Sequence, residues 1–219
     1  MKLLVVSAHP DDETLGAGGT ILKHKRDGNK IFWLNFTDMK KEYGYSIRNI
    51  RKRTDEIEKV KEIYNFDEFY NLKLKPAGLD KYSKKELIEK ALESMNKIKS
   101  NIVILPFKND VHSDHKIIFD IVYSCTKIFR NPFIKKILMM EILSETDFAS
   151  SDTGFIPNYF VDISDFLEKK IEIMNIYKSE IKNHPYPRSK ENIRALAIHR
   201  GASVGCKYAE GFILIKGIE

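Results

Sequence analysis

The sequence of 219 residues predicts a single α/β domain with a Rossmann-like fold, in which a mainly parallel sheet is flanked by helices. Short apolar, β-branched runs typical of buried strands alternate with helical patterns, and this alternation favours parallel strands joined by crossover helices. No internal repeat, low-complexity stretch or linker-like segment separates one part of the chain from another. Charged clusters follow two of the expected strands, where open α/β sheets bind their ligands. We therefore expect residues 1–219 to form one domain.

The first half of the chain contains four expected strands, at 3–6, 30–37, 69–72 and 101–105, where apolar and β-branched residues run together. Helices are expected between them at 20–26, 47–64 and 83–99. The glycine-containing stretch 16–19 opens the first of these helices, and Asp27-Gly28 is a typical helix C-terminus. Ser83 and Glu86 form a capping box at the start of the third helix.

The second half continues the pattern with a helix at 113–129, a strand at 134–142, a short extended segment at 158–163 and a closing strand at 211–215. Ser164 is expected to cap a helix that runs to about residue 181, and a further helix is expected at 190–199. The segment 183–189 contains two prolines, so it cannot be regular. Gly201 and Gly205 mark the loop before the last strand.

Composition argues against several classes of protein. The net charge of +6 comes largely from lysines interleaved with glutamates along helices, and the basic run 48–53 lacks aromatic residues, so we expect no nucleic-acid partner. No apolar run reaches the roughly 18–20 residues of a transmembrane helix, so we expect no membrane partner. Met1-Lys2 leads directly into the first strand, which leaves no room for a signal peptide. Cys125 and Cys206 lie far apart, which is typical of buried thiols in a reducing compartment. We therefore expect a cytoplasmic protein, and a homo-oligomer is compatible with the sequence.

The stretch 5–19, VVSAHPDDETLGAGG, carries the first charged cluster. His9, Asp11, Asp12 and Glu13 place an imidazole and three carboxylates within five residues, directly after a buried strand. Such a concentration of like charge is costly at a buried position unless a cation lies there. His9 and Asp12 can both point at one cation, and imidazole nitrogen with carboxylate oxygen suits zinc or another first-row divalent metal.

A second charged cluster, NDVHSDH at 109–115, also follows a buried strand. Because the carboxyl ends of parallel strands share one edge of a sheet, both clusters should meet there. A catalytic zinc site needs a third protein ligand and an open position for water, and this cluster supplies the candidates His112, Asp114 and His115. Asp114 can orient one of the neighbouring histidines, or it can simply be favoured by the dipole at the start of a helix.

With AHPDDE at 8–13 and HSDH at 112–115, the sequence resembles the LmbE-like (PIG-L) deacetylases, and the resemblance covers nearly the whole chain. These enzymes use zinc to remove acetyl groups from N-acetylglucosaminyl compounds. Residues 53–56 match the family's R-x-x-E, and residues 200–210 resemble its closing R-G…G…Y-A-E. The segment 177–180 is similar to a Y-x-S-Q element, with glutamate in place of the usual glutamine.

The resemblance implies roles for five residues. His9, Asp12 and His115 would bind zinc, with iron(II) or another divalent metal as the alternative that the same ligands accept. Asp11 would act as the general base on the water at the metal, and His112 would stabilise the oxyanion or protonate the leaving amine. The implied reaction removes the N-acetyl group from an N-acetylglucosamine-type sugar or glycoconjugate and gives a free amine and acetate. The implied partner is a small-molecule acetamido sugar.

Four other residues are candidates for supporting roles. Arg53 can bind a sugar hydroxyl or an acidic aglycone, or it can form an ion pair within its own helix. Tyr186 is the nearest candidate for the substrate-facing tyrosine that some relatives place in a late loop. Glu13 can support the metal site or face the first turn of the helix, and Asp38 can line the pocket or cap a turn.

Two alternative functions are open. An amidase of the same family would cleave a larger N-acyl or thiol-conjugate amide with the same machinery. A dinucleotide-binding module would use the first strand, the glycines and the helix that follows, with Asp38 at the ribose. Against the second alternative, Gly16-x-Gly18 is followed by Ile21 at the position of the third glycine, and the acids at 11–13 would repel a pyrophosphate.

Overall fold

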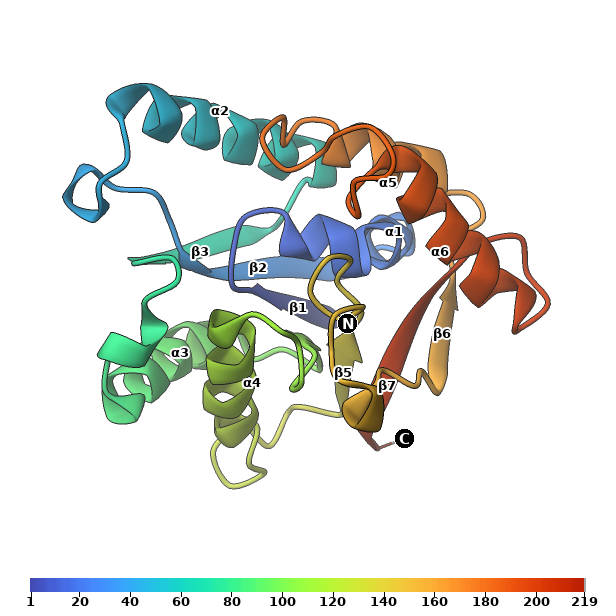
Figure 1. The fold of residues 1–219 in the computed structure, drawn as a ribbon. Coiled ribbons are helices and arrows are strands. Elements are labelled where there is room, and N and C mark those ends of the chain that lie inside the picture. Colours follow the sequence, from blue (N-terminus) through green and yellow to red (C-terminus); the bar gives the residue numbers. More distant parts are fainter. Residues whose placement is uncertain (219) are drawn as a thin grey trace.

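One sheet of seven strands, in the order β3-β2-β1-β4-β5-β7-β6, runs through the computed structural model, which describes residues 1–218 (Figure 1). The strands are β1 (Lys2–Ser7), β2 (Lys30–Thr37), β3 (Glu68–Leu74), β4 (Ile102–Pro106), β5 (Lys136–Met140), β6 (Tyr159–Asp162) and β7 (Ala209–Gly217). Strands β1 to β5 pair in parallel, whereas β7 runs antiparallel to both β5 and β6. The predicted mainly parallel sheet is therefore confirmed.

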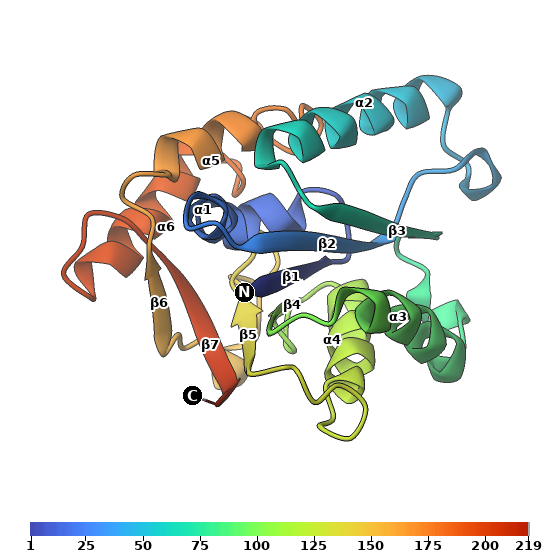
Figure 2. The same ribbon diagram turned by 180° about the vertical axis from the view of Figure 1, so that it is seen from behind.

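Helices cover both faces of this sheet. They are α1 (Asp12–Arg26), α2 (Ile47–Tyr64), α3 (Lys84–Ile98), α4 (Ser113–Cys125), α5 (Leu167–Met174) and α6 (Lys190–Ala202). Figures 1 and 2, drawn from opposite sides, show α1, α2, α5 and α6 on one face and α3 and α4 on the other. The predicted α/β domain with a sheet flanked by helices is confirmed.

The central strand β1 supplies both layers of the core. Successive side chains of a strand point to opposite faces. Leu3 and Val5 therefore pack under α1 and its neighbours, whereas Leu4 and Val6 pack against the α3–α4 side, and all four are fully buried. Burial on both faces explains why this strand is a continuous apolar run rather than an alternating one.

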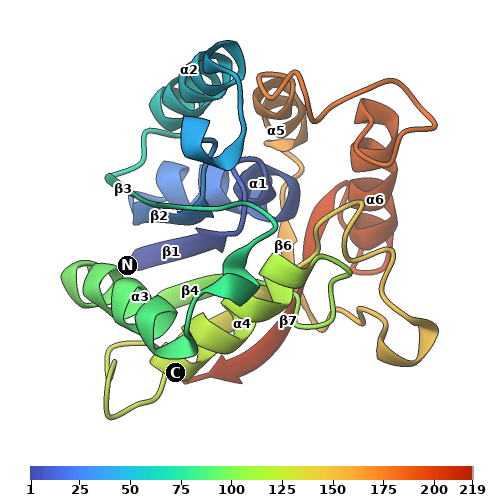
Figure 3. The same ribbon diagram turned by 60° about the vertical axis from the view of Figure 1, so that its left-hand side comes forward.

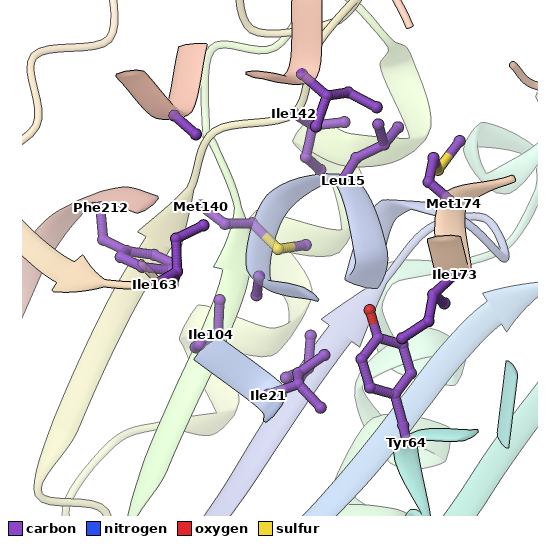
Figure 4. Packing of buried hydrophobic residues seen from close by; sticks show 14 of the residues in the cluster. Leu15, Ile21, Tyr64, Ile104, Met140, Ile142, Ile163, Ile173, Met174 and Phe212 are labelled. Atoms are coloured by element: carbon purple, nitrogen blue, oxygen red, sulfur yellow. The ribbon is translucent and has the colours of Figure 1, made fainter. Parts of the chain in front are cut away.

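The first helix begins earlier than the sequence suggests. The prediction places it at 20–26 with an opening at 16–19, but α1 is helical from Asp12 onward. A Cβ atom on Gly16 would lie 2.6 Å from the Met140 sulfur, and one on Gly19 would lie 2.6 Å from a methyl carbon of Ile163. Figure 4 shows Met140 and Ile163 packed against this helix. The glycines therefore lie inside α1, where they permit close packing, rather than at its opening.

Other boundaries differ at helix ends. Strand β2 and helix α2 match their predicted ranges, but α4 ends at Cys125 instead of 129, where the Asn131 side chain donates a hydrogen bond to the Cys125 carbonyl (2.7 Å). Helix α5 ends at Met174 instead of about 181. The residues between α5 and α6 form a long irregular connection, and their side chains contribute to the site described below.

Within residues 1–218, no helix has both the length and the apolar composition needed to cross a membrane. The two cysteines are free thiols. Cys125 is buried and Cys206 is half-buried, so the expectation of a buried thiol is met by Cys125 alone.

Candidate active site and metal centre

A cavity of about 220 Å³ lies at the carboxyl edge of the sheet, beside the ends of β1, β2 and β4. The residues that follow β1 and β4 meet here, as the two charged clusters predict. Its wall includes His9, Asp11, Asp38, Arg53, His112, Glu145, Glu180 and Arg188. Glu180 and Arg188 belong to the connection from α5 to α6. This connection, orange in Figure 3, lies on the same side of the molecule as α1 and α2.

His9, Asp12 and His115 come together at one point. Nδ1 of His9 lies 3.8 Å from Oδ2 of Asp12, and Nε2 of His115 lies 3.4 Å from the same oxygen. One ligand atom from each of the three residues lies within 4.8 Å of the others. Two nitrogens and a carboxylate oxygen in this arrangement can hold a divalent cation and leave a position open.

Two buried polar atoms at this point support a metal site. Oδ1 of Asp12 and Nε2 of His115 are buried and have no hydrogen-bond partner among the described residues. The other nitrogen of each histidine faces a carboxylate: His115 Nδ1 lies 2.7 Å from Asp110, and His9 Nε2 lies 3.2 Å from Asp114. When each neutral imidazole donates its N–H to that acid, its other ring nitrogen presents a lone pair toward Asp12. The residues therefore fit a divalent metal ion.

Electrostatics at the same point favour positive charge. Burial alone would lower the pKa of His115, but Asp12 and Asp110 outweigh it and raise the pKa to about 10. Burial would raise the pKa of Asp12, but His115 lowers it below its ordinary value. Without a metal, these two carboxylates therefore retain a proton on the imidazole between them, at a position where a cation is stabilised.

The second cluster divides into supporting and cavity-facing residues. Asp114 accepts hydrogen bonds from the N–H groups of Ala77 (2.7 Å) and Leu79 (3.3 Å) as well as contacting His9. Because its two oxygens already have these donors, Asp114 supports His9 better than it would bind a metal itself. The contact of Asp110 with His115 was not anticipated from the sequence.

His112 lies at the N-terminus of α4 and faces the cavity. Its Nδ1 accepts a hydrogen bond from the Asp114 N–H (3.1 Å), so the neutral ring carries its proton on Nε2. Burial, followed by the nearby His9 and His115, lowers the pKa of His112 to about 4. At neutral pH the ring is therefore an uncharged hydrogen-bond donor toward the cavity.

Asp11 adopts an unusual backbone conformation, with φ of +144°, directly between β1 and α1. Such a conformation is strained for a non-glycine residue and persists only where the surroundings impose it. The Asp11 N–H donates to Glu13 Oε2 (3.0 Å), and the Asp11 carboxylate accepts from Arg188 Nη1 (2.6 Å). Burial raises the pKa of Asp11 well above its usual range, although Arg188 opposes this shift.

Glu13 is fully buried beneath Asp11. Its other oxygen accepts hydrogen bonds from the hydroxyl groups of Thr14 (2.6 Å) and Tyr177 (2.9 Å). Burial raises the pKa of Glu13 to about 7, against the opposing effect of these hydrogen bonds. Of the two interpretations from the sequence, the structure supports the one in which Glu13 stabilises the loop that carries the site.

Arg53 lines the cavity, but its guanidinium is largely occupied by protein groups. It donates to the Pro10 carbonyl (2.7 Å) and the Ser179 hydroxyl (3.0 Å), and it pairs with Glu180 and, at 3.5 Å, with Glu56. The ion pair with Glu56 within α2 corresponds to one of the two interpretations from the sequence. Its place on the cavity wall is compatible with the other interpretation, in which Arg53 binds a sugar hydroxyl or an acidic aglycone.

Of the two remaining candidates, Asp38 and Tyr186, only Asp38 is among the residues that line the cavity. Asp38 lines the cavity and accepts a hydrogen bond from Asn71 (2.7 Å). Tyr186 does not line the cavity, and its ring lies 4.9 Å from the Lys182 ammonium. Arg188 and Glu145 line the cavity but were not anticipated, because both lie in irregular segments where no sequence pattern singles them out.

A family model described as PIG-L, GlcNAc-PI de-N-acetylase, matches residues 4–126, which is more than half of the chain. The chain belongs to the PIG-L family. A diacetylchitobiose deacetylase from Thermococcus kodakarensis is 27% identical over 235 residues, and the match covers 99% of this chain and 84% of that protein. The resemblance drawn from the motifs of the sequence is thereby confirmed.

Solved structures share the fold of this PIG-L member. N,N'-diacetylchitobiose deacetylase from Pyrococcus horikoshii, complexed with its inhibitor MPG, is 22% identical with a TM-score of 0.77, over 99% of this chain and 84% of that chain. GalB, the 4-carboxy-2-hydroxymuconate hydratase from Pseudomonas putida KT2440, is 15% identical with a TM-score of 0.76, over 100% of this chain and 97% of that chain. Because these two proteins are named for different reactions, the fold alone does not decide the reaction.

Proposed function

We propose that this PIG-L protein is a metal-dependent hydrolase that removes the N-acetyl group from an N-acetylglucosamine-type sugar or glycoconjugate. The observation that carries the proposal is that two buried atoms, Asp12 Oδ1 and His115 Nε2, have no hydrogen-bond partner among the described residues. They lie beside a cavity that His9, Asp11 and His112 line. The diacetylchitobiose deacetylase relative supports an acetamido sugar as the substrate class.

His9, Asp12 and His115 would hold the metal. Zinc is the expected ion, because two imidazoles and one carboxylate with an open position suit its catalytic sites, and iron(II) is the alternative. A divalent ion bound by these residues would polarise the amide carbonyl and increase the acidity of a water molecule.

Asp11 and His112 would have different roles in the reaction, Asp11 as the base and His112 as the group that stabilises the oxyanion. As the oxygen of water forms its bond to the carbonyl carbon, Asp11 accepts a proton from that water. His112 donates a hydrogen bond from Nε2 to the carbonyl oxygen as negative charge develops there. The nitrogen then takes up the proton that Asp11 accepted, the C–N bond breaks, and the amine leaves together with acetic acid, which ionises to acetate. Tyr186, which lies outside the cavity wall, is not part of this proposal.

The charges on the cavity wall favour an uncharged substrate. Four carboxylates, on Asp11, Asp38, Glu145 and Glu180, face two guanidinium groups. Both arginines already form ion pairs with these or neighbouring acids. In the described wall, no unpaired cation is therefore available for a phosphate group, whereas a neutral sugar and its cationic amine product are well accommodated.

The proposal is tested by measuring acetate release across a panel of N-acetylated sugars, with the bound metal quantified in the same samples. We expect acetate and a free amine from an N-acetylglucosamine-type compound, and about one divalent ion per chain. His115→Ala should bind the metal far more weakly, because one of three ligands is lost. Full occupancy and activity in that variant would show that the ligand set is wrong.

The amidase of the same family is the second candidate. It uses the same residues, so the substrate decides between the two: inert acetamido sugars together with cleavage of longer N-acyl or thiol-conjugate amides would favour it. Absence of amine release from every amide would exclude both hydrolases and favour another reaction on the same fold.

A further inference from the structure

We propose that Arg188 is a positioning residue that holds the carboxylate of Asp11 in the orientation needed to accept a proton. The catalytic consequence rests on the proposed function, but the contact itself is a property of the fold. Arg188 comes from the connection between α5 and α6, 177 positions along the chain from Asp11.

The guanidinium of Arg188 is fixed from several directions. Nη1 donates to Asp11 Oδ2 (2.6 Å) and lies 3.3 Å from Glu180. Nε donates to the Ser144 hydroxyl (2.6 Å), and Nη2 donates to Glu145 (3.0 Å). Since the guanidinium is planar and rigid, partners on three separate segments determine its orientation and therefore that of the carboxylate it holds.

Arg188 has little capacity left to bind substrate. A guanidinium has five N–H groups, and the four contacts named above use four of them. The side chain is also largely buried, with 13% of its surface exposed. Loss of Arg188 should therefore affect the chemical step more than the binding of the sugar.

Asp11 depends on this contact more than on any other for the position of its carboxylate. The backbone around it is held by Glu13, which accepts the Asp11 N–H, and by Arg53, which donates to the Pro10 carbonyl. Among the described residues, Arg188 is the sole hydrogen-bond donor to the side chain of Asp11. Oδ1 of Asp11 has no hydrogen-bond partner among those residues, so it can accept a proton while Oδ2 is held.

The test uses two substitutions and one control in the metal-loaded protein. Arg188→Lys retains the charge but cannot hold Asp11, Ser144 and Glu145 together, and Arg188→Gln also removes the charge. Arg194→Gln is the matched control, because Arg194 forms a largely exposed ion pair with Glu168 and neither residue lines the cavity. We measure kcat, KM, bound metal and the thermal unfolding midpoint for each protein.

In Arg188→Lys, we expect kcat to fall about 100-fold, the typical cost of misplacing a reacting group by about 1 Å, with KM and bound metal within about twofold of the wild type. Arg188→Gln should lose at least as much, and Arg194→Gln should match the wild type. Unchanged kcat in Arg188→Lys and Arg188→Gln, a change confined to KM, or loss of metal or of the folded state in Arg188→Lys would each overturn the proposal.

A crystal structure of Arg188→Gln gives a readout that is independent of the reaction. The Asp11 carboxylate should rotate away from its wild-type position while His9, Asp12 and His115 stay in place. An unmoved carboxylate would overturn the proposal. If the wild type cleaves no amide, the proposed function fails, and the movement of Asp11 still decides whether Arg188 positions it.

Discussion

Replacing Glu13 by glutamine should change how the stability of this protein depends on pH. Glu13 is fully buried, and burial raises its pKa from 4.5 to about 7. The folded state therefore favours the protonated carboxyl, and ionisation of Glu13 costs stability. Below about pH 4.5, Glu13 is largely protonated in the folded and unfolded states, so there is no cost. The cost grows as the pH rises toward 7 and is complete above it.

The size of this effect follows from the two pKa values. A tenfold change in a protonation constant corresponds to about 1.4 kcal/mol, so a rise from 4.5 to about 7 corresponds to about 3 kcal/mol. Glutamine can still accept the Asp11 N–H and donate to the hydroxyl oxygens of Thr14 and Tyr177, but it cannot ionise. Between pH 5 and pH 8, the stability of Glu13→Gln relative to the wild type should therefore increase by about 2–3 kcal/mol. Any pH-independent effect of the substitution adds a constant to this difference.

Urea unfolding of the metal-free proteins at several pH values between 5 and 8 measures this difference. Metal is removed with a chelator so that metal binding does not add its own pH dependence. Glu89→Gln, at an exposed position of α3, controls for the loss of one carboxylate. A difference between wild type and Glu13→Gln that is constant with pH, or that decreases as the pH rises, would refute the reasoning.

Three further predictions concern the metal, the stability of α1 and the substrate. Asp12→Asn should lose most of the bound metal, whereas Asp11→Asn should retain it and lose about 10²–10⁴-fold in kcat; reversed metal contents would show that the two roles are exchanged. Lys170→Met should lower the free energy of unfolding by about 3–5 kcal/mol in urea, because it leaves the Glu210 carboxylate buried without its cation, and a loss below about 1 kcal/mol would contradict this. The value of kcat/KM should be about tenfold or more higher for diacetylchitobiose than for UDP-N-acetylglucosamine, because the acidic cavity wall repels the diphosphate. Equal values would show that the charge of the wall does not select the substrate.

Lys170 and Glu210 connect the closing motif of the chain to the middle of α1. Glu210 accepts hydrogen bonds from the N–H groups of Gly19 and Thr20 in the middle of α1, and Lys170 donates to the Leu15 carbonyl (2.8 Å). The ion pair thus satisfies backbone groups of the helix that begins at the metal site. Neither Lys170 nor Glu210 lines the cavity at the candidate metal site.

The sequence predicts those parts of the fold that local patterns specify. Strand β2 and helix α2 match their predicted ranges, because a continuous apolar run and a helical period are local signals. The start of α1 at Asp12 was missed because glycine is a weak helix former, so the glycines at 16–19 indicate the opening of a helix rather than its interior. Contacts with Met140 and Ile163, which lie far away in the sequence, decide that these glycines are helical.

The same distinction applies to the site. The meeting of His9 with His115 could be predicted, because both follow strands whose carboxyl ends share one edge of the sheet. Asp110 and Glu145 could not, since each lies in a loop without periodic structure, and only the folded chain brings them to His115 and Arg188.

The connection between α5 and α6 shows why part of this site lies beyond local sequence patterns. The helical pattern predicts that α5 continues to about residue 181, yet the chain leaves the helix after Met174. Past this point, Tyr177 donates to Glu13, Glu180 pairs with Arg53, and Arg188 holds the carboxylate of Asp11. Arg188 contacts the candidate base Asp11 directly. Tyr177 and Glu180 act through Glu13 and Arg53, which form hydrogen bonds to the backbone of Asp11 and Pro10. In a regular helix, Tyr177 and Arg188 would lie about 16 Å apart along the axis. The irregular backbone instead lets both side chains reach neighbouring residues, Glu13 and Asp11, and so completes the second side of the site.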